Sequence, residues 1–320
     1  MQAYILRRLI LIMPTLFFVT LILFFVVRLI PGDIVEMMVT EHEQFYQSKG
    51  EDLLLEIRQK LGLDLPIHVQ YGKWIWGVIQ GDLGKSLWSG IRVTEVLVQR
   101  WPVSFELGIM AMVTGLIIAI PVGIFSAVRQ DSIGDYIARS AAIAGIALPS
   151  FWMGTIVMVF PSLWWGWSPR MEYVRFTENP VQNLGQFIIP AVILGMQLAG
   201  TTMRMTRTMM LEVLRQDYIR TAWSKGVKER VVVLRHALKN ALIPIVTIVG
   251  FQFPMLIGGS VVLEEIFNLP GVGRLIVQII NTRDYVMLSG INLIIATFVM
   301  VVNLSVDVTY SFLDPRVQYR

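Results

Sequence analysis

The chain has 320 residues, of which 55% are hydrophobic and 16% are charged. Soluble globular proteins average about 45–50% apolar and about 25% charged residues, so this composition indicates a protein whose solvent is lipid. The formal net charge of +4 would also be compatible with nucleic-acid binding, but in a membrane protein basic residues more often mark cytoplasmic loops, so nucleic acid is not an expected partner. The lack of cysteine excludes disulfides, thiolate metal sites and cysteine nucleophiles.

Six stretches of the chain are long and apolar enough to span a membrane. A helix rises about 1.5 Å per residue, so about 20 mostly apolar residues cross the hydrocarbon core. The six stretches are residues 9–30, 103–128, 137–160, 187–206, 242–263 and 286–306. The first is longer than the apolar region of a secretory signal, which has about 7–15 residues, and we expect it to be retained as a membrane anchor. The predicted fold class is an all-α integral membrane protein with six transmembrane helices.

Residues 31–101, between the first and second stretches, are predicted to form a small external subdomain. Apolar residues at helical spacing over residues 52–61 predict a short amphipathic helix within it. Residues 84–86, Gly-Lys-Ser, end like the phosphate-binding loop G-x-x-x-x-G-K-[ST], but Ile79 stands where the first glycine is required. We interpret this segment as a turn. Any ATP hydrolysis that drives transport is therefore expected on another polypeptide.

The connection between the fourth and fifth stretches indicates which side of the membrane is cytoplasmic. Its basic residues are Arg204, Arg207, Arg215, Arg220, Lys225, Lys228, Arg230, Arg235 and Lys239. Only Glu212, Asp217 and Glu229 offset them. Lysine and arginine collect in short cytoplasmic loops, so this connection is predicted to be cytoplasmic. With six crossings, both termini lie on the same side.

The cores of the six stretches contain no Asp, Glu, Lys, Arg or His. A gradient-driven carrier needs an ionisable or ion-coordinating group near the membrane midplane, because its own chain couples the substrate to a proton or sodium gradient. The composition therefore disfavours a carrier. A neutral sodium site built from hydroxyls and carbonyls leaves a carrier or channel as an alternative, and a structural membrane anchor is a third.

Residues 211–242 are too charged to lie in lipid and too regular for an unstructured loop. Apolar residues recur at helical spacing at Leu211, Leu214, Tyr218 and Ala222. Gly226 then interrupts the pattern, and a second helical stretch begins near Lys228. We predict a helix, a turn in which Gly226 has a positive φ, and a second helix. An amphipathic helix lying on anionic lipid is the alternative.

Residues 217–226 resemble the E-A-A-x-x-x-G loop of binding-protein-dependent ABC importer permeases. Arg220, Thr221, Ala222 and Gly226 stand at the family's glutamate, two alanines and glycine. The departures at the first two positions are typical of the dipeptide, oligopeptide and nickel branch, in its first permease subunit type, whose loop reads D-Y-[IV]-R-T-A-x-x-K-G and continues H-A-L-x-N-A-L-x-P. Further matches in collinear order lie at residues 4–8, 81–84, 204–214, 236–244, 264–274, 283–285, 303–307 and 313–316. The resemblance spans nearly the whole chain.

This resemblance implies the transmembrane domain of a type I ABC importer, with five core helices after one extra N-terminal helix. The chain would then divide into an N-terminal helix (1–30), the external subdomain (31–101), a five-helix domain (102–310) with a cytoplasmic coupling loop (207–240), and a cytoplasmic tail (311–320). The implied partners are a second, homologous permease subunit, two ATPases that bind ATP and magnesium, and an extracytoplasmic substrate-binding protein, in a bacterial or archaeal cytoplasmic membrane. The chain itself is expected to bind no cofactor or metal and to catalyse no reaction. Its expected substrates are peptides or similar small solutes.

The resemblance also implies two sets of site residues. The expected ATPase-docking residues are Asp217, Arg220, Thr221, Ala222, Lys225, Gly226 and Glu229. Among them, Ala222 is expected to be small enough for close approach to a partner. The candidate residues at the external mouth of the translocation path are Glu264, Glu265, Pro270 and Gly271. We favour a structural turn for this second set, because irregular backbone at membrane depth is tolerated only where protein or water shields it from lipid.

Overall fold

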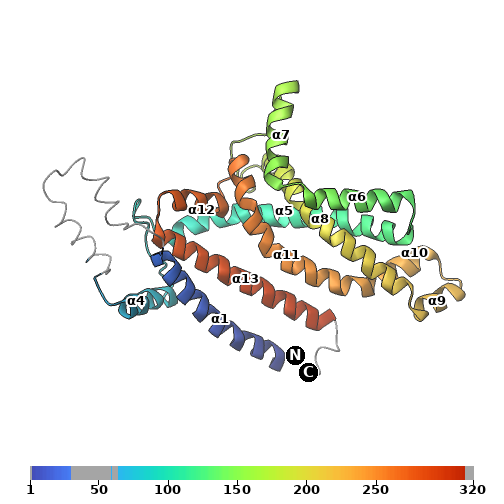
Figure 1. The fold of residues 1–320 in the computed structure, drawn as a ribbon, viewed down its shortest axis with the longest axis horizontal. Helices are drawn as coiled ribbons and strands as arrows, with labels where there is room; N and C mark the ends of the chain where they lie inside the picture. Colours follow the sequence, from blue (N-terminus) through green and yellow to red (C-terminus); the bar gives the residue numbers. More distant parts are fainter. Residues whose placement is uncertain (1, 30–58, 60–63, 314–320) are drawn as a thin grey trace. The chain divides into compact units, whose positions relative to one another are not determined.

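The computed structural model describes residues 2–29, 59 and 64–313 of the chain, and these residues form helices joined by short loops (Figure 1). The helices are α1 (Gln2–Leu29), α4 (Ile67–Ile79), α5 (Val93–Val128), α6 (Ile133–Ala147), α7 (Ser150–Trp165), α8 (Pro180–Leu214), α9 (Asp217–Ser224), α10 (Glu229–Val231), the π-helix η1 (Val232–Ala237), α11 (Leu238–Ile266), α12 (Val272–Asn281) and α13 (Tyr285–Leu313). The described residues contain no strand, only an isolated bridge between Lys85 and Arg92. The predicted all-α class is confirmed.

The apolar helices account for the predicted membrane segments. Four helical stretches in the described residues are long and apolar enough to cross a membrane: Val93–Val128, Pro180–Leu214, Glu229–Ile266 and Tyr285–Thr309. The pair α6 and α7 qualifies as one further span that is bent. A shorter apolar stretch, Ile10–Val26, lies within α1. Each of the six predicted segments falls on one of these.

The prediction of one continuous helix over residues 137–160 is wrong. The chain bends by 92° between α6 and α7. Pro149 lies at the bend with φ −64° and ψ 136°, and Leu148 before it is extended, with ψ 121°. A proline lacks the N–H of a helical hydrogen bond and disfavours helical backbone in the residue before it, so α6 has to end here. The sequence Leu-Pro-Ser at residues 148–150 could have indicated this bend.

The chain forms two compact units. The first comprises Met1–Leu9, Gln99–Leu275 and Phe298–Arg320, and the second comprises Ile10–Val98 and Ile276–Thr297. Within the first unit, α8 packs against α6, α7 and α11. The predicted domain boundaries stay a prediction.

Close helix contacts in the first unit depend on small residues. A Cβ atom added to Gly195 of α8 would lie 2.6 Å from the carbonyl oxygen of Ala111 on α5, and one added to Gly115 of α5 would lie 2.8 Å from the carbonyl oxygen of Gly195. Small residues let membrane helices approach until their backbones touch, which supplies the packing that lipid cannot drive by hydrophobicity. Beside this contact, Phe187 and Leu194 are buried in the core of the unit.

In the second unit, the loop after α4 is held by the residues just before α13. The Ser86 hydroxyl donates to Asp284 Oδ2 at 2.6 Å, and the Trp88 indole donates to the Thr282 carbonyl at 2.7 Å. Asp284 also accepts from the backbone N–H of Met287 in the first turn of α13. Lys85 forms the isolated bridge with Arg92 and the turn follows at residues 87–89, so the turn lies just after residues 84–86 and not within them as predicted. The predicted helix over residues 52–61 lies outside the described residues except for residue 59.

Candidate functional site

The short helix α9 is attached to the first unit by one side chain. Ile219 is the only buried residue of α9. It enters a group of apolar residues contributed by α5, α8, η1 and α11, which we term the inner cluster. Its fully buried members are Ala127, Met210, Ile219, Val232, Val233, Ala237 and Ala241. Tyr218 adds a second attachment, because its hydroxyl accepts a hydrogen bond from the Asn240 side-chain amide at 2.7 Å.

The predicted register of this segment is wrong in one respect. We expected one helix to carry Tyr218 and Ala222 on the same face as the residues before position 215. Instead α8 ends at Leu214 and α9 begins at Asp217, after Gln216 with extended backbone (φ −72°, ψ 149°). This break turns the following helix, so Ile219 points inward and Tyr218 is exposed. Sequence reasoning missed Ile219 because a helical pattern keeps its phase only while the helix is unbroken.

The turn after α9 has the geometry that the sequence predicted. Gly226 has φ +74°, a left-handed conformation that costs glycine little. Its N–H donates to the Trp223 carbonyl at 2.9 Å, and the Val227 N–H donates to the Ala222 carbonyl at 3.2 Å. These two bonds form a Schellman motif, in which glycine ends the helix and the next apolar residue packs back onto it. Val227 and Ala222 both pack against the inner cluster.

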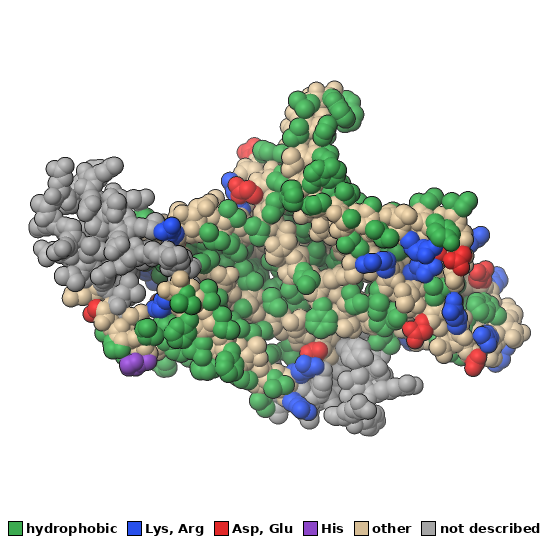
Figure 2. Space-filling view, viewed as in Figure 1, with side chains coloured by type: hydrophobic (Ala, Val, Ile, Leu, Met, Phe, Trp, Pro, Cys, Tyr) green, Lys and Arg blue, Asp and Glu red, His purple; other side chains and the backbone are tan. Residues whose placement is uncertain are grey.

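The other face of α9 and the turn after it are exposed and charged. The exposed residues among the predicted docking residues are Asp217, Arg220, Thr221, Lys225, Gly226 and Glu229. On this surface, Arg220 Nη1 lies 3.7 Å from Asp217 Oδ1. Figure 2 shows lysine and arginine side chains gathered over the α9 and α10 end of the molecule. With the exposed Lys228 and Arg230 beside them, basic side chains outnumber acidic ones on this surface.

Ala222 differs from its neighbours in this set. It is half-buried, one turn after Ile219, and it contacts the inner cluster. Its small size is therefore needed by the chain itself, since a larger side chain here would displace apolar residues of the inner cluster. Whether it also limits the distance to a partner stays a prediction.

A buried carboxylate that sequence reasoning did not single out lies at the base of this site. Asp135, in the first turn of α6, is fully buried. Its two oxygens accept from Arg207 Nε at 2.9 Å and Nη2 at 2.8 Å, so α6 and α8 are joined by a two-bond ion pair. The Ser126 hydroxyl of α5 and the Asp131 N–H also donate to it, and Arg139 Nε lies 3.4 Å away. The ends of α5, α6 and α8 are thereby fixed to one another close to α9.

The predicted residues of the external mouth separate into buried and exposed ones. Glu264, in the last turn of α11, is fully buried. Its carboxylate accepts from the hydroxyls of Ser104 and Ser260 at 2.6 and 2.8 Å and from the backbone N–H of Arg274 at 2.9 Å. A carboxylate at the first turn of α12 satisfies N–H groups that have no partner within that helix. Glu264 is thus a structural residue of this fold.

The remaining residues of this set surround that carboxylate. A Cβ atom added to Gly271 would meet the Glu264 carboxylate, so the glycine is required by close approach. Pro270 is half-buried, and Glu265 is exposed with its carboxylate 3.4 Å from Arg274 Nε. A contact between substrate and Glu265 or Pro270 stays a prediction.

Known proteins resemble this chain over its full length. Residues 119–319 match the family described as "Binding-protein-dependent transport system inner membrane component", and residues 1–108 match its N-terminal counterpart. The chain is 38% identical to the dipeptide transport system permease protein DppB of Escherichia coli K12 over 343 aligned residues, with all of both chains covered. It is 39% identical over 323 residues to the oligopeptide transport system permease protein AppB of Bacillus subtilis 168, again with all of both chains covered.

A solved structure shares the fold of the chain. The MetNI methionine ABC transporter, in an inward-facing conformation, aligns with a TM-score of 0.54 at 16% identity. The alignment covers 69% of this chain and 97% of the other. At this identity the likeness shows the fold alone, which is that of an ABC transporter membrane subunit.

Proposed function

This chain belongs to the family of binding-protein-dependent transport system inner membrane components, and from that premise we propose that it pairs with a second, homologous permease subunit in an importer driven by two separate ATPases. An extracytoplasmic binding protein delivers the substrate. The two permease subunits together enclose the path by which the substrate crosses the membrane. ATP and magnesium are bound by the ATPases. The chain's own contribution is mechanical, since its exposed α9 surface receives the motion of an ATPase and its packed helices carry that motion to the path.

The observation that supports this proposal is the attachment of α9. A loop that only rested on lipid headgroups would need an amphipathic helix with its apolar face exposed. Here the aliphatic side chain Ile219 is buried in the inner cluster, and the exposed side carries charged residues together with the aromatic side chains Tyr218 and Trp223. A protein surface with complementary acidic charge fits such a helix. Because Ile219 and the Tyr218–Asn240 hydrogen bond fix α9 to α8 and α11, a displacement of α9 would move both long helices.

We further propose that the substrates are peptides. Two relatives that align over the full length of the chain are named for dipeptide and oligopeptide transport. A gradient-driven carrier or channel without an ATPase is the alternative, and uptake of labelled peptide into vesicles with and without enclosed ATP separates the two.

The docking surface is tested by reversing its charge. In the variant Arg220→Glu with Lys225→Glu, two exposed basic side chains become acidic while Ile219 and Gly226 are unchanged. An exposed ion pair contributes about 0.2–1 kcal/mol, so the loss of two attractions and the added repulsion should weaken ATPase binding about tenfold. The measurement is the amount of ATPase, relative to second permease, that is recovered with the tagged chain from solubilised membranes.

The control variant is Arg175→Glu, which reverses an exposed charge in the loop between α7 and α8. It should leave the ratio of ATPase to permease unchanged. If the double variant also retains the wild-type ratio, and peptide-stimulated ATP turnover is unchanged, α9 is not the docking element. The lipid-surface interpretation of this segment would then replace the proposal.

A further inference from the structure

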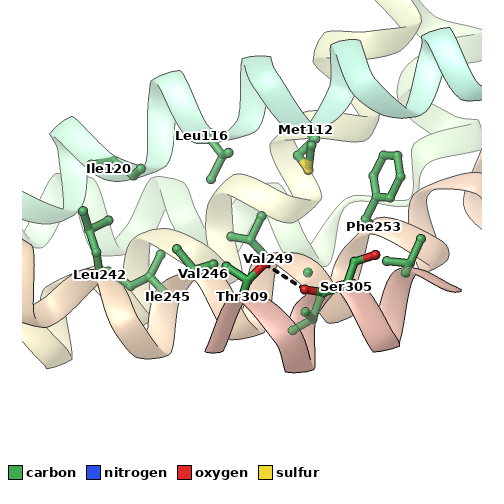
Figure 3. A pocket seen from close by; sticks show the side chains of 13 residues that line it. Met112, Leu116, Ile120, Leu242, Ile245, Val246, Val249, Phe253, Ser305 and Thr309 are labelled. Carbon is green, nitrogen blue, oxygen red and sulfur yellow. Dashed lines mark hydrogen bonds between the residues drawn. The ribbon is translucent and has the colours of Figure 1, made fainter. Parts of the chain in front are cut away.

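A pocket of about 470 Å³ lies between three membrane-spanning helices of the first unit, α5, α11 and α13 (Figure 3). Its walls include Leu116 and Ile120 from α5, Val246 and Val249 from α11, and Val306 from α13. In Figure 3, Leu116 of α5 lies across the gap between the helices from Val246 and Val249 of α11.

The lining of the pocket offers no unused hydrogen-bond donor among the described residues. Only two lining side chains are polar, and both hydroxyls donate to their own helix. Ser305 donates to the Val301 carbonyl at 2.8 Å, and Thr309 donates to the Ser305 carbonyl at 2.7 Å. A peptide or other polar solute would leave its N–H and C=O groups unpaired here, at a cost of roughly 2–7 kcal/mol for each group. The occupant is therefore apolar.

The dimensions of the pocket match a single hydrocarbon chain. Along α11 it extends from Leu242 to Phe253, or about 17 Å at 1.5 Å per residue. A volume of about 470 Å³ over that length gives a width of about 6 Å for the centre of a water molecule, and the radius of about 1.4 Å on each side brings the free width to about 9 Å. An α-helix with its side chains is about 10–12 Å across and does not fit inside. Carbon atoms in contact lie about 3.5–4.0 Å apart, so one extended acyl chain does.

The two ends of the pocket differ in chemistry. At the end formed by Phe253, aromatic rings close it, because Phe253 lies 5.9 Å from Phe105 and 6.0 Å from Phe298 between ring centroids. At the other end, exposed Lys239 lies one helical turn before the lining residue Leu242. Residues three apart on a helix share a face, so Lys239 lies on the pocket side of α11, just beyond the end of the pocket.

We propose that this pocket binds one acyl chain of an anionic phospholipid, with the methyl end against Phe253 and the phosphate at Lys239. This arrangement provides a binding surface for both the acyl chain and the headgroup of the lipid. The apolar walls take the chain, and the ammonium group offers a charge-assisted hydrogen bond to the phosphate. A lipid held there packs against α5, α11 and α13 together, which makes it a structural ligand of the permease.

The test uses the full chain with its co-purifying partners in nanodiscs of phosphatidylethanolamine and phosphatidylglycerol. The probe is a trace of phosphatidylglycerol that carries a photoactivatable diazirine on one acyl chain, and labelled peptides are identified by mass spectrometry. Label on the lining peptides of α5, α11 and α13, relative to the rest of the chain, measures occupancy. The variants Leu116→Trp and Val246→Phe fill the pocket from two different helices, and each should lower this ratio at least fivefold.

Two matched controls complete the experiment. Ile117→Trp adds the same side chain next to Leu116 on an exposed position of α5, and it should leave the ratio unchanged. Lys239→Gln should lower labelling by the phosphatidylglycerol probe to the level of a phosphatidylcholine probe, whereas Lys228→Gln should not. Equal labelling in Leu116→Trp and Ile117→Trp would overturn the acyl-chain site. Cross-links from the lining to the second permease, in place of lipid, would assign the pocket to that subunit.

Discussion

Asp135 is held in a buried ion pair in the first unit. The carboxylate is fully buried, and the paired Arg207 side chain is 16% exposed. Removal of one partner from a buried ion pair costs about 3–5 kcal/mol, because the other charge remains without compensation. Since Arg207 keeps some access to solvent, the lower part of that range applies here.

We therefore expect Asp135→Asn to destabilise the permease by about 3 kcal/mol, since the neutral amide leaves the Arg207 charge uncompensated. The melting temperature of the purified chain in nanodiscs should fall by several degrees. Asp131→Asn is the matched control, because Asp131 is exposed and has φ +59°, a conformation that asparagine also tolerates. Equal melting temperatures of the two variants would mean that the ion pair adds nothing to stability.

Gly226 and Glu264 show which residues can be understood from the sequence. A helix commonly ends at a residue with positive φ, and glycine adopts that conformation at little cost. Both the end of the helical pattern and the glycine at position 226 can be seen in the local sequence. The role of Glu264 depends on Ser104, which is 160 positions away, and on backbone N–H groups of the following helix. No local pattern contains that information. Two adjacent glutamates near a membrane boundary are equally typical of a polar mouth and of a buried cap.

At the scale of helices, the contact between α5 and α8 depends on the absence of a side chain at Gly195. Its added Cβ would lie 2.6 Å from both the Ala111 carbonyl oxygen and the Thr114 hydroxyl, and backbone cannot yield as a flexible side chain does. Forcing an extra side chain into a packed core costs about 1–3 kcal/mol or more. The two helices would have to separate.

Gly195→Val should accordingly lower both the yield of folded protein and its melting temperature. The control is Gly185→Val on the same helix, where an added Cβ meets nothing within 4 Å. Both changes replace glycine by the same β-branched residue, so the intrinsic helical preference changes alike and the difference reports the helix contact. If the two variants elute as equally monodisperse particles and have the same melting temperature, the close approach of α5 and α8 is not required for stability.

The helix predictions failed where the chain changes direction. Hydropathy located each apolar stretch because about 20 such residues are unusual in any other setting. It did not detect the bend at Pro149, since both arms of the bend are apolar, nor the break at Gln216, since the residues on each side are helical. The break at Gln216 affects the proposed docking site, because it turns α9 so that Ile219 points inward and Tyr218 is exposed.

For the whole molecule, membership in the family establishes an inner-membrane component, and the sidedness of its loops rests on charge. Nine basic residues against three acidic ones in residues 204–239 predict that α9 faces the cytoplasm. The predicted six crossings put the loop between α7 and α8 on the opposite side, which is also a prediction. The absence of cysteine from the sequence makes this directly measurable, since any single introduced thiol is the only one in the chain.

We expect Lys225→Cys and Glu178→Cys to react with a membrane-impermeant maleimide from opposite sides. Both positions are exposed, so access to the reagent is decided by the membrane and not by burial. In intact spheroplasts Glu178→Cys should be labelled and Lys225→Cys should not, and permeabilisation should make labelling of the second equal to that of the first. Ile219→Cys is the control for burial and should stay unlabelled in both conditions. Labelling of Lys225→Cys in intact spheroplasts would place α9 outside the cell, where it has no ATPase to meet, and would remove the proposed docking function together with the predicted orientation.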